Sequence, residues 1–168
     1  MASPPIERLI ENPGTGERIR LLTRAEETGG RLLAFELHLE PGGRVPAPHR
    51  HPGQEESFQV LEGRLRFRVG LRARVLGPGD AITVPVGAPH GFSNPGPTPA
   101  LVRVEVRPAL RTAELLEVGA RLGARPGPLK LARFLAEFAA EVSSPLLPRL
   151  VTGVARRLTR LAGQSTAF

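Results

Sequence analysis

Residues 43–63 read GRVPAPHRHPGQEESFQVLEG and residues 79–94 read GDAITVPVGAPHGFSN. Together the two segments hold three of the four histidines in a chain of 168 residues. Because successive side chains of a strand alternate between its faces, His49 and His51 point the same way and can bind one ion as a pair. A turn at Pro52 and Gly53 allows a carboxylate to reach the same ion, and His90 arrives from a distant strand. The two segments therefore predict the two halves of one metal site.

The composition restricts both the metal and the class of protein. The chain has no cysteine, so imidazole and carboxylate groups are the available ligands, and these suit Fe, Mn, Ni, Cu or Zn. The formal net charge is +7, carried almost entirely by arginine. With neither Trp nor Tyr available for base stacking, the basic strand residues indicate a solvated face rather than a nucleic-acid site. Since neither a secretory leader nor an apolar run of about 20 residues is present, we expect a cytoplasmic protein without a membrane span.

Short alternating segments separated by Gly and Pro predict strands over most of the chain. The clearest is 31–39, where Leu33, Phe35 and Leu37 share one face. The pattern changes at Pro108, after which apolar residues recur at helical spacing in 112–122, 128–142 and 145–162. We expect an irregular lead-in over 1–18, a β-barrel over 19–111, and a helical extension over 112–168 that packs on the barrel or on a dimer partner.

The two histidine segments resemble the cupin superfamily. The first motif of that family, G-x5-H-x-H-x(3,4)-E-x6-G, is filled by five residues: Gly43, His49, His51, Glu56 and Gly63. The second motif, G-x5-P-x-G-x2-H-x3-N, is filled by another five: Gly79, Pro85, Gly87, His90 and Asn94. The resemblance implies a mainly β protein, a double-stranded β-helix or jelly-roll barrel, here with an α-helical C-terminal extension. It also implies one divalent transition metal per chain, a small-molecule substrate or ligand, and a homodimer.

The resemblance further implies the ligand set His49, His51, Glu56 and His90. Glu55 is adjacent to Glu56, but six residues separate Glu56 from Gly63, as the motif requires. Glu56 also shares a strand face with apolar residues, whereas Glu55 shares a face with polar ones. We therefore assign Glu56 as the carboxylate ligand.

The surroundings of the metal are predicted from strand faces alone. We expect an apolar lining formed by four residues: Phe58, Val60, Phe67 and Phe92. His38, Arg103 and Glu105 are candidates for a second layer around the metal, although alternation favours a solvated face for each of them.

Two functions remain open for this site. One is a small metal-dependent enzyme, with dioxygenase-like oxidation favoured over the isomerase and decarboxylase chemistry that relatives also perform. The other is a ligand-binding or sensing module that holds a metal without turnover. The sequence assigns no catalytic acid or base.

Overall fold

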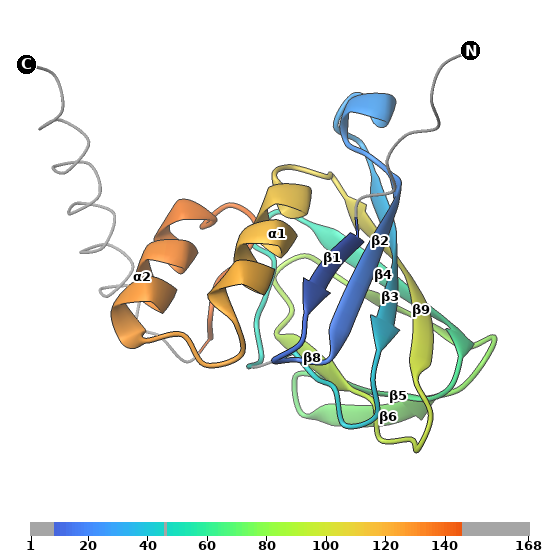
Figure 1. Ribbon diagram of the computed structural model, residues 1–168. Helices are drawn as coiled ribbons and strands as arrows, with labels where there is room; N and C mark the ends of the chain where they lie inside the picture. Colours follow the sequence, from blue (N-terminus) through green and yellow to red (C-terminus); the bar gives the residue numbers. More distant parts are fainter. Residues whose placement is uncertain (1–8, 46, 146–168) are drawn as a thin grey trace, which may run out of the picture.

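A computed structural model describes residues 9–45 and 47–145 of the chain. This part of the protein contains nine strands, a 3₁₀ turn and two α-helices (Figure 1). The strands are β1 Leu9–Asn12, β2 Glu17–Thr23, β3 Leu33–Leu39, β4 Glu55–Glu62, β5 Leu65–Val69, β6 Arg72–Leu76, β7 Ala81–Val84, β8 His90–Ser93 and β9 Ala100–Arg107. The helical elements are η1 Glu26–Thr28, α1 Thr112–Leu122 and α2 Pro128–Glu137.

The strands form two antiparallel sheets, as the jelly-roll prediction requires. The larger sheet has the order β1-β2-β3-β9-β4-β7, and the smaller has the order β6-β5-β8. Apolar side chains from both sheets meet in one core, where the rings of Phe58 on β4 and Phe67 on β5 lie 4.7 Å apart. Such a pair dominates the packing of a small barrel, because removing one buried phenylalanine costs about 3–5 kcal/mol.

Alternation along the central strands confirms the predicted faces. Phe35 on β3 pairs with Val104 on β9, and Val104 pairs in turn with Phe58 on β4. All three side chains are buried, while the next cross-strand pair, Glu36 and Arg103, lies on the other face of the sheet. The larger sheet therefore has one apolar face toward the core and one charged face away from it.

Several motif positions that are not candidate ligands have a structural explanation. A Cβ atom at Gly63 would lie 2.5 Å from the carbonyl oxygen of Pro99, so only glycine fits there. The buried Asn94 donates from Nδ2 to the carbonyl oxygens of Leu39 and Thr98, at 2.9 Å and 2.8 Å. These residues hold loops together around the barrel.

The N-terminal prediction needs one correction. An irregular lead-in was expected up to residue 18, but Leu9–Asn12 forms β1 and pairs with β2. The short strand was missed because proline and glycine on both sides of it dominate the local composition. The buried side chain of Ile10 opposite Ile19 explains why this segment joins the sheet.

The helical extension follows the prediction in part. The helix expected over 112–122 is present as α1; its N-terminus has no side-chain capping bond, and Oγ1 of Thr112 accepts a hydrogen bond from Gln54. The helix expected over 128–142 ends at Glu137, and residues 138–141 form a turn in which the amides of Glu141 and Val142 donate to the carbonyl of Phe138. The third helix, expected over 145–162, lies almost wholly outside the described residues.

Neither helix described here is long and apolar enough to cross a membrane. Both lie on the same side of the barrel, with α1 next to β1 and α2 beyond it (Figure 1). The extension therefore packs at the β1 edge of the larger sheet through α1, and α2 packs on α1.

Candidate metal site

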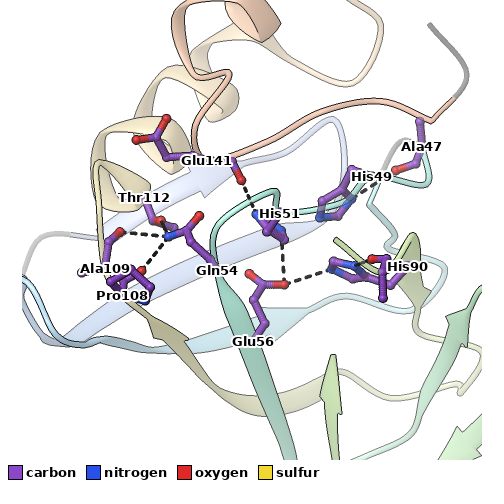
Figure 2. A network of polar contacts seen from close by, with 11 residues as sticks. Ala47, His49, His51, Gln54, Glu56, His90, Pro108, Ala109, Thr112 and Glu141 are labelled. Carbon is purple, nitrogen blue, oxygen red and sulfur yellow. Dashed lines mark hydrogen bonds and ion pairs between the residues drawn. The ribbon is translucent and has the colours of Figure 1, made fainter. Parts of the chain in front are cut away.

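The four predicted ligands lie together in the fold. Their ligand atoms are all within 4.8 Å of one another. Glu56 and His90 stand at the beginnings of β4 and β8, while His49 and His51 belong to the loop before β4. Two backbone hydrogen bonds of 3.0 Å and 2.8 Å join His49 to His90, which brings the two sequence segments side by side. We refer to these four residues as the ligand cluster (Figure 2).

Each imidazole of the ligand cluster is oriented by a backbone carbonyl. The Nδ1 atoms of His49, His51 and His90 lie 3.3, 2.5 and 3.1 Å from the carbonyl oxygens of Ala47, Glu141 and Ala88. A carbonyl can only accept, so each Nδ1 carries the hydrogen and donates it. The Nε2 atoms are therefore the ones available to a metal, and this pattern is typical of metal-binding histidines.

The carboxylate of Glu56 is the electrostatic centre of the cluster. Its Oε2 lies 2.9 Å from Nε2 of His90 and 3.3 Å from Nε2 of His51. Burial alone would raise the pKa of Glu56, but the two imidazoles hold that pKa well below its usual range. Burial opposes charge on His51 as well, yet the neighbouring carboxylate raises the pKa of His51.

His49 differs from the other two histidines. Burial, together with the neighbouring His90 and His51, lowers the pKa of His49 to about 3. Its imidazole is thus neutral at physiological pH, which is the form that binds a metal. The cluster combines one neutral imidazole, one imidazole paired with a carboxylate, and a carboxylate that stays ionised.

These residues fit a single divalent transition metal. The buried Nε2 of His51 faces Oε2 of Glu56 at 3.3 Å, but it makes no hydrogen bond of acceptable geometry. A buried polar atom without a partner is costly, and a metal bound by the cluster would satisfy it. Three imidazoles and one carboxylate suit Fe, Mn, Ni, Cu or Zn equally, so the donor set does not select one of them.

The extension contacts the loop that carries two of the ligands. Arg50, which stands between His49 and His51 in the sequence, pairs with Ser143. Two backbone hydrogen bonds of 3.0 Å and 2.9 Å join these two residues. The same segment supplies the Glu141 carbonyl that receives the Nδ1–H of His51. The side chain of Glu141 points elsewhere and accepts a hydrogen bond from the amide of Arg111.

Gln54 provides a second connection to the extension. Its buried amide nitrogen lies 2.8 Å and 3.1 Å from the carbonyl oxygens of Pro108 and Ala109, and 2.7 Å from Oγ1 of Thr112 (Figure 2). Sequence reasoning missed Gln54, although a polar residue between the histidine pair and β4 was the available signal. It could not have found Glu141, because that contact uses only the main chain.

A cavity of about 460 Å³ adjoins the ligand cluster, and His49, His51 and Glu56 form part of its wall. Of the four residues expected to line a pocket, Phe58 and Phe92 also belong to this wall. Val60 and Phe67 do not; they are buried in the core, with 0% and 1% of their surfaces exposed. The cavity lies between the cluster, the inner face of the larger sheet and the helices, since residues of all three belong to its wall.

The three second-layer candidates are not brought to the cluster. His38 alternates with Leu37, and Arg103 and Glu105 alternate with Val104, on strands whose buried residues face the core. They therefore lie on the charged face of the larger sheet. Glu105 accepts a hydrogen bond of 2.5 Å from Arg107 on that face.

Comparison with known proteins agrees with this geometry. The family model described as "Cupin domain" matches residues 35–106. Germin-like protein subfamily T member 3 of Arabidopsis thaliana is 36% identical over 72 residues, which are 40% of this chain and 31% of that protein. The chain thus spans about a third of the length of the curated relatives it matches.

Solved structures show the same fold at low sequence identity. An RmlC-like cupin from Shewanella frigidimarina matches 67% of this chain and 93% of its own, with 21% identity and a TM-score of 0.55. A cupin-superfamily sugar phosphate isomerase from Silicibacter pomeroyi matches 61% of this chain and 71% of its own, with 24% identity and a TM-score of 0.53. The family-model match over residues 35–106, which contains both histidine motifs, assigns the barrel to the cupin superfamily, and the solved structures share its fold.

Proposed function

We propose that this protein is a metal-dependent enzyme that acts on a small molecule, with His49, His51, Glu56 and His90 holding one divalent transition metal. The observation that carries the proposal is that three of these ligands form part of a cavity wall. A purely structural metal needs a closed shell of protein ligands, whereas a catalytic one needs access for its substrate. When bound, such a metal supplies Lewis-acid or redox chemistry.

The residues around the cluster support a site that binds and orients its substrate. Phe58 and Phe92 give an apolar surface next to the ligands, which excludes water and strengthens electrostatic interactions there. Among the described wall residues, Glu17 and Arg125 are the charged side chains outside the cluster. Isomerisation by proton transfer is helped by a positioned acid or base, and no such group is assigned here. We therefore place dioxygenase-like oxidation first and assign no catalytic acid or base.

The second candidate is a ligand-binding module that holds its ligand at the metal without turnover. The apolar wall beside the cluster favours it equally, because binding alone requires no proton transfer. The two candidates differ in whether a bound small molecule is consumed.

We also propose that the protein forms a homodimer in the cytoplasm. In the described sheets, β1 and β7 are the outer strands of the larger sheet and β6 and β8 those of the smaller. Outer strands carry unpaired backbone groups that a second copy can cover. Analytical ultracentrifugation of the purified chain tests the dimer, and a single monomeric species at micromolar concentration would contradict it.

Elemental analysis of the purified protein tests the metal site. We expect about one transition-metal ion per chain, and metal affinity at least about 100-fold lower in His49→Ala and His90→Ala, since each loses a donor. His38→Ala is the matched control, because His38 lies on the charged face of the larger sheet, and it should retain the metal. If wild-type protein contains no metal and takes up none on titration, the proposal is wrong.

Activity then separates the two candidates. Protein that contains iron is tested for oxygen consumption with catechols, diketones and thiols, alongside His90→Ala. Metal-dependent consumption of a substrate supports the enzyme. Saturable binding of a compound that is recovered unchanged supports the binding module.

A further inference from the structure

The cavity beside the ligand cluster has two apolar walls from different parts of the chain. The barrel contributes one wall, with Ile19, Phe35, Leu37, Phe58 and Val104. The helical extension contributes the other, with Leu115, Leu116, Leu131, Phe134 and Leu135. A cavity of about 460 Å³ with these walls is within the range of small-molecule sites. The extension is thus part of the binding site as well as a cover for the barrel.

Residues of the cavity wall lie far apart in the register of the larger sheet. Glu56, at one end, is level with Val106 and through it with Leu33, the first residue of β3. Glu17, also in the wall, is level with Leu39, the last residue of β3. Six residues along a strand correspond to about 20 Å. An occupant that reaches both ends has to be elongated.

A gap in the helical wall lies at Gly119. This glycine is inside α1 and belongs to the wall, as does Phe134 of α2. A Cβ atom at Gly119 would lie 3.7 Å from Cζ of Phe134, an ordinary contact, so the position has room for a side chain. A helix with glycine at an interior position is less stable than one with alanine there. The missing side chain at Gly119 leaves space that adds to the cavity.

We propose that the extension makes the cavity a chamber for an elongated, mainly apolar small molecule with a polar end at the ligand cluster. The apolar walls define the body of the molecule, and the sheet register defines its length. The placement of the polar end rests on the proposed function, because it requires a metal at the cluster. The chamber itself depends only on the two walls.

Straight-chain carboxylates test the proposal, because their heads bind metals and their tails differ only in length. The chain has no Trp or Tyr, so binding of butanoate, hexanoate and octanoate is measured by calorimetry. We expect affinity to rise about threefold to fourfold per methylene group, as burial of an apolar group predicts. Gly119→Leu should abolish most of this rise, and Gly119→Ala should reduce it less.

Gly77→Leu is the matched control, because it adds the same side chain at a glycine that does not belong to the cavity wall. Thermal unfolding by circular dichroism checks that each variant is folded. If Gly119→Leu does not fold, Ala120→Leu replaces it, since Ala120 is also part of the wall. An affinity that is independent of tail length, or that changes equally in the Gly119 and Gly77 variants, would overturn the chamber.

Comparison with His90→Ala distinguishes this inference from the proposed function. If the metal is confirmed but tail length has no effect, the chamber is wrong and the metal site stands. If affinity rises with length in both proteins and the His90→Ala change costs nothing, the chamber stands and the placement of the polar end is wrong. The proposal as a whole predicts a uniform loss of affinity in His90→Ala, with the same dependence on tail length.

Discussion

The barrel and the helical extension contribute to the same site by different means. The barrel supplies all four candidate ligands as side chains, with Glu56 and His90 on strands and His49 and His51 in the loop before β4. The extension supplies a backbone carbonyl to His51, a backbone bridge to Arg50, and one wall of the cavity. The chemistry of the site therefore resides in the barrel, whereas its shape and part of its orientation come from the extension.

This difference makes each part sensitive to a different kind of change. A side-chain substitution removes a ligand from the barrel outright. A main-chain contact of the extension is insensitive to most substitutions, because every residue has a carbonyl group and all except proline have an N–H. A test of the barrel should therefore replace a ligand side chain, whereas a test of the extension should remove a main-chain hydrogen bond.

The largest effect is expected in the barrel, at Glu56. Glu56→Gln keeps the shape of the side chain but removes the negative charge between His51 and His90. Metal affinity should fall at least about 100-fold, since even the outer partners of metal ligands are worth about 10- to 100-fold. Calorimetric titration of metal-free protein with Zn²⁺ measures this.

Glu55→Gln is the matched control for Glu56→Gln. Glu55 is exposed and precedes Glu56 on the opposite face of β4, so its removal should change metal affinity by less than about twofold. Equal losses in the two variants would mean that net charge, rather than ligation by Glu56, determines metal affinity.

The difference between the barrel and the extension also explains which features could be predicted from the sequence. Strand alternation is a local property, so it correctly placed Glu56 and Phe58 on the inner face and Arg103 on the outer face. The distance of a strand residue from the cavity is not a local property of the sequence. Phe58 and Val60 share a face of β4, yet only Phe58 belongs to the cavity wall. That distinction depends on where the extension packs.

The contacts of the extension were not predictable for a physical reason. Helical spacing identified α1, but it could not show that the segment after α2 pairs through Ser143 with a loop more than 90 residues away in the sequence. Apolar spacing continues past Glu137, so the pattern gave no stop signal there.

An intermediate effect is expected at Gln54, which joins the ligand loop to the start of the extension. Gln54→Ala leaves the carbonyls of Pro108 and Ala109 without this donor, and buried groups left unpaired cost about 1–3 kcal/mol. We expect a loss of about 2 kcal/mol in the free energy of unfolding, measured by urea denaturation. Gln59→Ala, at an exposed position of β4, should cost less than about 0.5 kcal/mol. If the two variants are equally stable, Gln54 does not hold the parts together.

The smallest effect is expected at Ser143, where the extension acts on a ligand through its backbone. Ser143→Pro removes the N–H that donates to the carbonyl of Arg50 at 2.9 Å, so the strand-like bridge beside His51 is lost. Metal affinity should fall about tenfold, because the carbonyl that orients His51 is no longer held in place. Ser143→Ala keeps the backbone bridge and removes only the contact of Oγ with Arg50, so its affinity should stay within about twofold of wild type. Since both variants remove the same hydroxyl, a difference between them isolates the backbone contribution. Equal affinities would show that the barrel alone orients His51, and would leave the extension only its role as a cavity wall.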